Sequence, residues 1–282
     1  MDKKLLNEVF EDLIKKDKTY FETGFWELDE LLHMQEGGAL ITIGARPSMG
    51  KTTFLYSLAE KLAKKEKNIL LFSLEIPQNH VISRLLCQNA EIDFIKIRKN
   101  CLNQEESEAI ISALNEMSKW DLHIDDTAGP DISYIEDKIK KIKPDVVFID
   151  YLQLIRGNHS SDRYKEVTDI VKNLKRISEE NKIVIFVNSQ LSRACETRYD
   201  KYPMLSDLRD SGAIENLSDV VIFIYRPEYY NQKDKEGELS VKGETHIIVA
   251  KNRFGCCGTV YMYFKSQIPK FFSGRSKLDD IF

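Results

Sequence analysis

The stretch Gly44-Ala45-Arg46-Pro47-Ser48-Met49-Gly50-Lys51-Thr52 decides the expected fold, because it joins an apolar run at residues 39–43 to a helical pattern at residues 52–65. A turn between a strand and a helix that ends in Gly-Lys-Thr is typical of a phosphate-binding loop. Consecutive backbone N–H groups and the N-terminus of the following helix hold phosphate oxygens in such a loop. Ala45 replaces the first glycine of the usual pattern, but the tight turn depends mainly on the final Gly-Lys-Thr. The sequence therefore predicts a nucleoside-triphosphate site at this turn.

The residues of this loop have separate expected roles. Lys51 is expected to neutralise the β- and γ-phosphate oxygens and the Thr52 hydroxyl to ligate Mg²⁺, so the predicted cofactors are ATP and magnesium. A chance occurrence of Gly-Lys-Thr is the alternative, and the strand and helix on either side disfavour it. Contacts with the nucleotide are predicted for Arg46, Ser48, Met49, Gly50, Lys51, Thr52 and Thr53.

Apolar, β-rich runs alternate with helical patterns along the rest of the chain. The run at residues 146–149 is continuously apolar, which indicates a strand buried on both faces, as in a parallel sheet covered by helices. Two late runs flank a Gly-Cys-Cys-Gly turn and predict a closing hairpin. The expected fold is α/β, with a mostly parallel twisted sheet, helices on both faces and a C-terminal β-hairpin. Strands are predicted at residues 39–43, 68–74, 146–149, 183–187, 220–225, 245–250 and 259–264, and further helices at 78–89 and 163–181.

Three apolar runs lead into polar residues, namely Glu75, Asp150 and Gln190. In a doubly wound sheet, ligands bind beyond the carboxyl ends of the strands, so these residues are expected beside the nucleotide. Asp150 is predicted to be a magnesium partner, and Glu75 a general base that orients and deprotonates the attacking water. Gln190 is expected to sense the γ-phosphate. Each residue alone could be an ordinary polar strand end, but their joint placement favours a catalytic site.

Composition limits the class of protein. The 41 basic and 45 acidic residues give a formal net charge of −4, which argues against a globally basic DNA-coating surface but not against a local basic channel. No apolar run reaches the roughly 18 residues that a membrane span needs, and the N-terminus shows no signal-peptide pattern. The cysteines lack C-x-x-C spacing, so no disulfide framework or zinc site is indicated. We expect a soluble, cytoplasmic protein without a membrane partner; its five cysteines are Cys87, Cys101, Cys195, Cys256 and Cys257.

Six stretches of the chain resemble the motor-domain motifs of DnaB-type replicative DNA helicases, and they occur in that family's order. The resemblance extends over residues 23–272 and is more specific than a phosphate-binding loop alone. It implies a RecA-like fold for the sheet predicted above. The stretches are residues 45–52, 72–75 (Phe-Ser-Leu-Glu), 149–154 (Ile-Asp-Tyr-Leu-Gln-Leu), 189–193 (Ser-Gln-Leu-Ser-Arg), 206–215 (Ser-Asp-Leu-Arg-Asp-Ser-Gly-Ala-Ile-Glu) and 251–255 (Lys-Asn-Arg-Phe-Gly).

The resemblance implies a homohexameric ring that translocates on single-stranded DNA and unwinds duplex DNA. Its nucleotide sites would lie between subunits and the DNA in the central pore. By position, Arg253 is similar to the finger that reaches the γ-phosphate of a neighbouring subunit, with Lys251 beside it. Arg209, Asp210 and Gly212 correspond to the family's pore loop, which grips the DNA backbone; an aspartate stands where the family usually has glutamate. Without the resemblance, these residues would be interpreted as ordinary solvated loop residues.

The chain has no segment long enough for the helical collar that usually precedes this motor and meets primase, so we expect a collarless form or a piece of a longer protein. A predicted helix at residues 2–15 has an apolar stripe that can pack on its own domain or, like the family's linker helix, on a neighbour. The tail, Ser-Lys-Leu-Asp-Asp-Ile-Phe, is either a frayed end or an acidic peptide that recruits a replication partner. The predicted domains are 1–20, linker helix and tether; 21–275, RecA-like motor; and 276–282, acidic tail.

Two other functions fit parts of the same pattern. A RecA-like ATPase with another role, such as a recombinase or a remodelling enzyme, would share the nucleotide site. A scaffold that assembles on binding nucleotide would need only the binding half of that site, and Glu75, Asp150 and Arg253 argue against it. A helicase loader, primase or another replication protein is a further partner that the resemblance implies.

Overall fold

The computed structural model describes residues 20–34, 37–157, 163–208, 211–230 and 242–274. The helix predicted at residues 2–15 and the tail at 276–282 lie outside the described residues. The limits predicted for the three domains therefore stay predictions.

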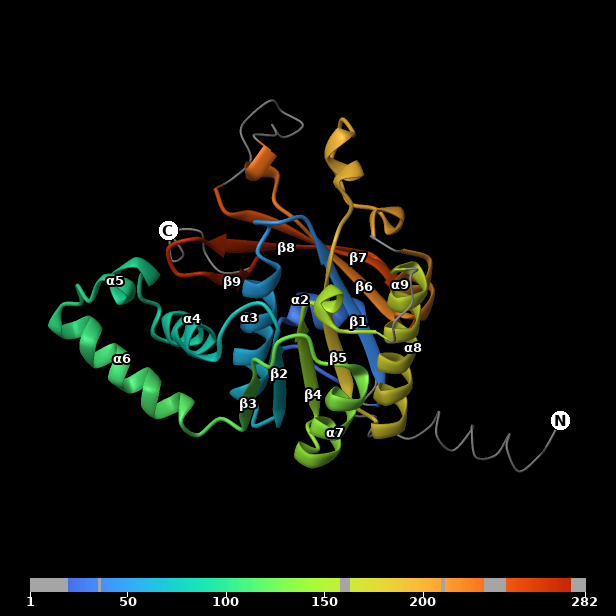
Figure 1. The fold of residues 1–282 in the computed structure, drawn as a ribbon. Helices are drawn as coiled ribbons and strands as arrows, with labels where there is room; N and C mark the ends of the chain where they lie inside the picture. Colours follow the sequence, from blue (N-terminus) through green and yellow to red (C-terminus); the bar gives the residue numbers. More distant parts are fainter. Residues whose placement is uncertain (1–19, 35–36, 158–162, 209–210, 231–241, 275–282) are drawn as a thin grey trace, which may run out of the picture.

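The described residues form one sheet with the strand order β3-β2-β4-β5-β1-β6-β7-β8-β9 (Figure 1). Neighbouring strands from β3 to β6 are parallel, and β6 to β9 pair antiparallel at the other edge. The predicted closing hairpin is the pair β7 and β8, to which β9 adds a strand. The strands are β1 (Ala39–Ala45), β2 (Ile69–Ser73), β3 (Leu122–Asp125), β4 (Val146–Asp150), β5 (Val184–Gln190), β6 (Val220–Tyr225), β7 (Glu244–Asn252), β8 (Gly258–Lys265) and β9 (Lys270–Ser273).

Helices cover both faces of the sheet (Figure 1). Side chains of α2, α3 and α4 join one apolar core, and those of α7, α8 and α9 join the other. The α-helices are α2 (Trp26–Leu32), α3 (Lys51–Ala63), α4 (Gln78–Ala90), α5 (Phe94–Lys99), α6 (Gln104–Met117), α7 (Ile132–Ile142), α8 (Arg163–Asn181) and α9 (Ser211–Leu217). Short 3₁₀ turns are η1 (Leu152–Leu154), η2 (Arg193–Thr197), η3 (Leu205–Asp207) and η4 (Pro227–Tyr230).

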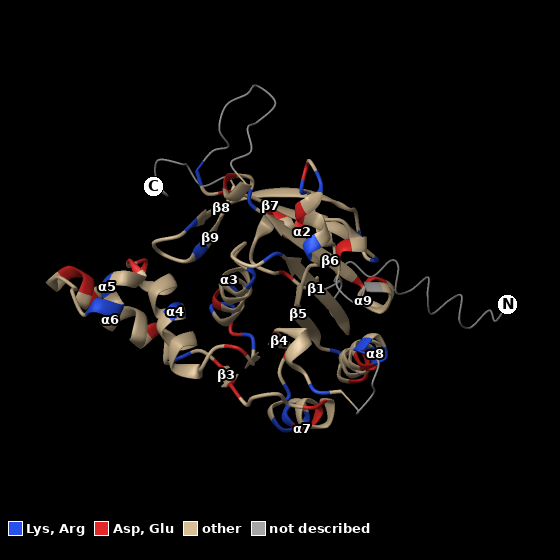
Figure 2. Cartoon of the chain, turned by 45° about the horizontal axis from the view of Figure 1, so that its top comes forward, with Lys and Arg blue, Asp and Glu red and all other residues tan. Residues whose placement is uncertain are grey.

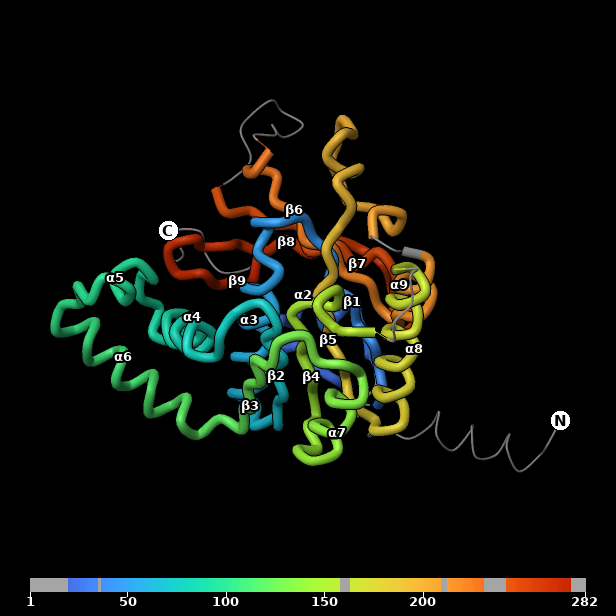
Figure 3. Tube along the Cα trace, in the orientation of Figure 1, coloured from blue at the N-terminus to red at the C-terminus, as the bar shows by residue number. Residues whose placement is uncertain are grey.

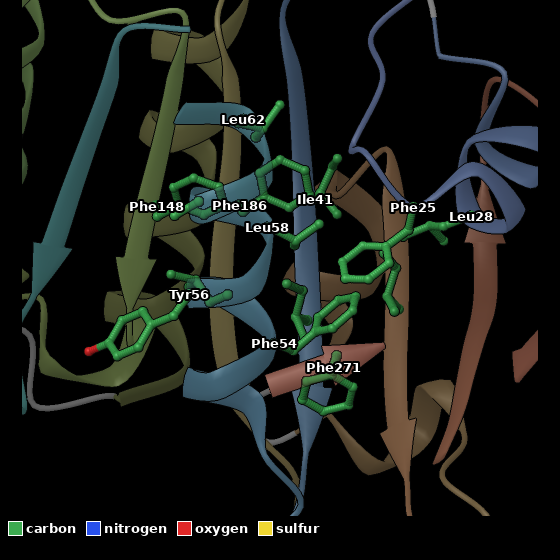
Figure 4. Close-up of a cluster of buried hydrophobic side chains, with 14 of the residues drawn as sticks. Phe25, Leu28, Ile41, Phe54, Tyr56, Leu58, Leu62, Phe148, Phe186 and Phe271 are labelled. Carbon is green, nitrogen blue, oxygen red and sulfur yellow. The ribbon is translucent and has the colours of Figure 1, made fainter. Parts of the chain in front are cut away.

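An aromatic cluster holds the helix that follows the phosphate-binding loop (Figure 4). Ten of the 13 residues of α3 are buried, so the helix is fixed on nearly every side. Phe54 stacks on Phe25 with ring centroids 5.9 Å apart and meets Phe271 edge-on at 5.2 Å. Burial of one such side chain stabilises the fold by about 2–3 kcal/mol. The N-terminus of α3 at Lys51 is therefore held firmly against the sheet.

The predicted fold class is confirmed, and the predicted strands and helices in the described part are present. No helix or strand was predicted between residues 94 and 142, where the structure has α5, α6, β3 and α7. Of these, α6 buries only Ala113 and β3 only Asp125, so neither has a continuous apolar stripe that a pattern search would find. Figure 3 shows α5 and α6 projecting to one side of the sheet beyond α4.

Charged residues of both signs are interspersed on the outer helices, whereas the strands are mostly uncharged (Figure 2). Such a surface agrees with the small net charge of −4. Among the described residues, no helix combines the length and the apolar character that crossing a membrane requires.

Candidate active site

The predicted nucleotide residues meet beyond the carboxyl ends of the parallel strands. Ala45, the last residue of β1, lies opposite Gln190 on β5. Ser73, the last residue of β2, lies opposite Asp150 on β4. Because β2, β4, β5 and β1 are neighbours in this order, the loop after β1 and Glu75 after β2 reach the same end of the sheet. This is where a doubly wound sheet binds its ligands.

The phosphate-binding loop has backbone conformations that favour glycine. Gly50 has a φ of 94°, and a Cβ added there would lie 3.1 Å from the Phe271 ring. A larger residue would therefore be strained in its backbone and crowded against the core. Ser48 has a φ of 66°, which is uncommon outside glycine and typical of ligand sites. Since α3 begins directly after Gly50, the unpaired N–H groups of its first turn face this loop.

Asp150 is held by side chains from two neighbouring elements. Its Oδ2 accepts a hydrogen bond from Thr52 Oγ1 at 2.6 Å, and its Oδ1 accepts one from Asn188 Nδ2 at 2.8 Å. Asp150 is only 1% exposed, and Asn188 Oδ1 is a buried acceptor with no described donor. A hydroxyl, a carboxylate and a spare carbonyl oxygen suit Mg²⁺ and its hydration shell. Among the described residues, no group of three or more His, Cys, Asp and Glu side chains could hold a metal ion.

The Lys51 ammonium group lies in the cleft among oxygen atoms. Its Nζ donates a hydrogen bond to Ala45 O at 3.3 Å. Burial lowers the pKa of Lys51, and the nearby carboxylates of Asp150 and Glu75 oppose that change. A partly desolvated ammonium group interacts more strongly with an arriving phosphate than an exposed one does. The surroundings of Lys51 thus favour the predicted phosphate contact.

These residues line a cleft of about 490 Å³. A hollow of about 520 Å³ lies at the opposite ends of the strands, but none of the predicted site residues lines it. The predicted ligand is a nucleoside triphosphate, so the candidate nucleotide site is the cleft beside the phosphate-binding loop. The cleft is lined by Pro47, Ser48, Gly50, Lys51, Thr52, Thr53, Glu75, Ile76, Arg84, Asp150, Tyr151, Gln190 and Phe264.

Two residues predicted to contact the nucleotide do not line the cleft. The guanidinium of Arg46 pairs with the carboxylate of Glu196, with Nε 3.0 Å from Oε1, and also donates to Leu191 O at 2.8 Å. The side chain of Met49 is buried in the core. The Met49 N–H donates to Arg46 O at 3.4 Å, so the roles of both residues in nucleotide binding stay predictions.

Lys251 and Arg253 lie at the opposite end of the sheet from the phosphate-binding loop. Arg253 Nη1 donates to Asp219 Oδ1 at 3.1 Å, and Asp219 Oδ2 accepts from Leu40 N at 2.8 Å. From Leu40 to Ala45, β1 extends roughly 16 Å. Lys251 Nζ donates to backbone carbonyls at the end of α9, 2.5 and 3.1 Å away. Neither side chain reaches the loop of its own chain, so a role in hydrolysis requires a second chain.

Asp219→Ala is expected to lower the free energy of unfolding by about 2–3 kcal/mol, because it removes a buried charged acceptor. The substitution leaves the Leu40 N–H unpaired and also removes the partner of Lys175 Nζ, 2.7 Å away. Denaturant unfolding measures this change. Asp219→Asn is the matched control. Its amide oxygen can still accept from the Leu40 N–H, so its free energy of unfolding should fall less than that of Asp219→Ala. Equal stability of wild type and Asp219→Ala would show that the network contributes nothing.

Two of the three residues predicted to contact DNA, Arg209 and Asp210, lie outside the described residues. Gly212 lies in the first turn of α9, where an added Cβ would approach the Tyr164 hydroxyl to 2.9 Å. The half-exposed Tyr164 side chain can move aside, so packing alone does not require glycine at this position. Its predicted contact with DNA stays a prediction.

The chain just before Arg209 is tied to the end of β5. Leu191 and Leu208 form an isolated antiparallel bridge, and Ser192 N donates to Asp207 O at 2.7 Å. Asp207 also accepts two hydrogen bonds from the Arg198 guanidinium, at 2.7 and 2.6 Å. Gln190 in the nucleotide cleft is thus one residue away from a backbone link to the segment that leads to Arg209.

The sequence did not predict a role for Phe264, which lines the cleft, or for Asn188 and Arg226 beside it. Asn188 could have been suspected, because an amide inside an apolar strand needs a partner. Phe264 comes from β8 and reaches the loop only through the order of the strands, which no local motif reveals. The guanidinium of Arg226 lies 4.3 Å from the Phe264 ring centroid, and its Nη1 donates to Ser48 O at 3.4 Å.

The family model described as "DnaB-like helicase C terminal domain" matches residues 21–273. The chain is 38% identical over 273 residues to "Replicative DNA helicase DnaC" of Bacillus subtilis (strain 168), covering 94% of this chain and 59% of that protein. It is also 38% identical over 269 residues to "Replicative DNA helicase DnaB" of Geobacillus stearothermophilus, covering 93% and 58%. The chain thus spans less than two thirds of the length of these relatives.

A solved structure is similar over nearly the whole chain. "The Structure Of A DnaB-Like Replicative Helicase And Its Interactions With Primase" has a TM-score of 0.89 at 33% identity and covers 97% of this chain and 68% of its own. A second solved structure, described as an ATPase domain, has a TM-score of 0.86 at 33% identity and covers 96% and 97%. Sequence and fold therefore indicate the same kind of relative.

Proposed function

This chain belongs to the family of DnaB-like helicase C-terminal domains, and from that premise we propose that it is the ATP-driven motor of a hexameric replicative helicase. Such a motor translocates on single-stranded DNA and unwinds duplex DNA. The observation that carries the proposal is the convergence of the phosphate-binding loop, Glu75, Asp150 and Gln190 on one cleft. A binding scaffold would need only part of this set. A recombinase or remodelling ATPase would share all of it, so unwinding must be measured.

In the proposed reaction, the cleft would bind ATP with Mg²⁺, and the metal would neutralise phosphate charge. Thr52 would ligate the metal and Asp150 would hold it directly or through water. Lys51 binds the β- and γ-phosphate oxygens. The Glu75 carboxylate, exposed at the mouth of the cleft, orients a water molecule and accepts its proton. Gln190 contacts the γ-phosphate and changes position when it leaves.

The nucleotide base is proposed to lie on the opposite flank of the loop from Glu75. There the Arg226 guanidinium lies over the mostly buried Phe264 ring, 4.3 Å from its centroid, and next to Ser48. Aromatic rings and guanidinium planes both stack on bases. Because stacking does not distinguish one base from another, this surface supports binding of several nucleoside triphosphates.

Assembly into a ring would place Arg253 at the γ-phosphate of a neighbouring subunit. Its side chain is 48% exposed at the sheet end away from its own loop, although Asp219 holds its guanidinium. A cation from outside the site offsets the charge that develops during phosphoryl transfer. The bridge between Leu191 and Leu208 then offers a physical route from the γ-phosphate sensor Gln190 to the proposed DNA loop.

Arg209→Ala is expected to abolish stimulation of ATP hydrolysis by single-stranded DNA and the unwinding of a forked duplex, while basal hydrolysis persists. Loss of one phosphate contact should also reduce the salt slope of DNA binding by about one. Turnover with and without DNA, followed by fork unwinding, tests both the residue and the proposed function. Arg176→Ala, on the outer face of α8, is a matched control.

Two outcomes contradict these proposals separately. Wild-type protein that hydrolyses ATP but never unwinds a fork would favour the recombinase or remodelling alternative. Unchanged DNA binding and stimulation in Arg209→Ala, with a wild type that does unwind, would show that this loop does not face the DNA.

Deletion of residues 2–15 is expected to leave a folded subunit that assembles poorly, because the apolar stripe of the helix is proposed to bury on a neighbour. The projecting helices α5 and α6 offer a surface on which the helix at residues 2–15 of a neighbour can pack. Their side chains Ile95, Ile111 and Leu114 are 56%, 58% and 46% exposed. Light scattering gives the mass of the assembly with an ATP analogue. Ile111→Glu should weaken assembly likewise, and loss of the cooperative melt on deletion would instead assign the helix to its own core.

A loader, primase or another replication protein is proposed as a further partner. One similar solved structure is described as that of a DnaB-like replicative helicase and its interactions with primase. For residues 276–282 a frayed end is the first expectation, and recruitment of such a partner by the acidic peptide is the alternative. A motor that works on chromosomal DNA would act in the cytoplasm, which is the proposed location.

A further inference from the structure

Two cysteines stand next to each other in the turn between β7 and β8. Cys256 and Cys257 are both exposed and both free. Cys87 and Cys195 are buried, and the remaining exposed cysteine, Cys101, follows α5. No other two cysteines are neighbours in the sequence. This turn therefore carries a dithiol that can be oxidised within a single chain.

The same turn carries Arg253, and one side chain connects the finger with the dithiol. Asn252 Nδ2, directly before Arg253, donates to Cys256 O at 3.2 Å and to Leu31 O near the end of α2 at 2.9 Å. The turn lies close to α2, because a Cβ added to Gly255 would be 2.5 Å from Leu31 O. The position of the Cys256 carbonyl is thus coupled to the residue that precedes the proposed finger.

A disulfide between neighbouring residues changes the backbone that it closes. Consecutive Cα atoms are about 3.8 Å apart across a trans peptide, whereas most disulfides join Cα atoms roughly 4.4–6.8 Å apart. The peptide between Cys256 and Cys257 must rotate before the two sulfur atoms can bond. That rotation moves the Cys256 carbonyl away from Asn252. A disulfide formed in this way is strained, so it is easily reduced again.

We propose that Cys256 and Cys257 are a modification site at which a peroxide forms a disulfide, and that this disulfide impairs the action of Arg253 on a neighbouring subunit. The effect on hydrolysis rests on the proposed function of Arg253. Disulfides in proteins of reducing compartments are mostly of this transient, redox-sensing kind.

The reaction needs only the two thiols and one peroxide molecule. The sulfur atom of one cysteine attacks a peroxide oxygen, the O–O bond breaks, and the cysteine becomes a sulfenic acid as one water molecule leaves. The neighbouring thiol then attacks the sulfenic sulfur, the S–S bond forms and a second water molecule leaves. The two thiols lose two electrons and two protons, and hydrogen peroxide is reduced to two molecules of water.

The test treats the dissociated full chain with hydrogen peroxide, removes the peroxide and then assembles rings with ATP and Mg²⁺. The tryptic peptide at residues 254–265 contains both thiols and should become lighter by two hydrogen atoms. Turnover of the assembled ring should fall about 10- to 100-fold, which is the effect of a misplaced catalytic group, and dithiothreitol should restore it. Basal turnover of dissociated subunits should change little.

Two variants show whether the effect belongs to this turn. The double variant Cys256→Ser with Cys257→Ser should keep its turnover after the same treatment. Cys101→Ser is the matched control, because it removes the other exposed cysteine and should stay as sensitive to peroxide as the wild type.

The outcomes are separable. A peptide that keeps both thiols while Cys101 is oxidised, or a disulfide to a second chain in place of the internal one, would overturn the modification site. An internal disulfide with unchanged ring turnover would overturn its effect on Arg253. A reduced wild type without turnover would contradict the proposed ATPase function, and the mass of the peptide would still decide on the modification site.

Discussion

Glu75→Gln is expected to reduce ATP turnover by about 10²–10⁴-fold while nucleotide binding is retained. Glutamine has almost the same size as glutamate and can still hydrogen-bond to water, but it cannot accept a proton. Glu75 follows β2 at the mouth of the cleft, where the charge it would lose is not needed to hold the fold. Steady-state phosphate release gives turnover, and fluorescent-nucleotide titration gives affinity.

A second variant separates chemistry from binding. Lys51→Ala should weaken binding itself, because it removes the ammonium group that lies in the cleft and donates to Ala45 O of the loop. Glu105→Gln, on the exposed side of α6, changes the same charge far from the cleft and should leave both quantities unaltered. Undiminished turnover in Glu75→Gln would show that Glu75 is not the general base.

Much of this site could be predicted from sequence because its residues occupy strand ends. A buried parallel strand is a continuous apolar run, and its end is marked by the first polar residue, as at Asp150. Parallel strands of one sheet share an end, so Glu75, Asp150 and Gln190 could be brought together without knowing the strand order. The loop itself is local, and its conformation at Gly50 follows from the backbone freedom of glycine.

The parts of the structure that could not be predicted from the sequence depend on contacts between distant segments of the chain. Asp219 joins β1, α8 and the turn after β7 through Leu40, Lys175 and Arg253, and none of these pairings is visible in a local pattern. Arg84 occupies a helix position that looks like ordinary surface until α4 is placed beside the cleft. The strand order decides such contacts, and strand order is a property of the whole chain rather than of any motif.

The position of Arg253 leads to the second large effect: Arg253→Ala is expected to lower turnover about 10³–10⁵-fold in the assembled ring, although its own nucleotide cleft is intact. The reason is distance, because Arg253 and the phosphate-binding loop lie at opposite ends of β1. In isolated subunits the same substitution should change basal turnover little. Comparing assembled with dissociated protein therefore separates an interfacial role from a structural one.

Mixing variants tests the interfacial site directly. Arg253→Ala subunits keep a functional phosphate-binding loop, and Lys51→Ala subunits keep a functional finger, so a mixed ring contains interfaces at which both are wild type. Turnover of the mixture should exceed that of either variant alone. Asp219→Asn serves as a control for damage to the fold, since it perturbs the residue that holds Arg253 without removing the finger. Verified mixed rings with no recovered turnover would contradict catalysis across the interface, because each would still contain complete sites formed by two chains.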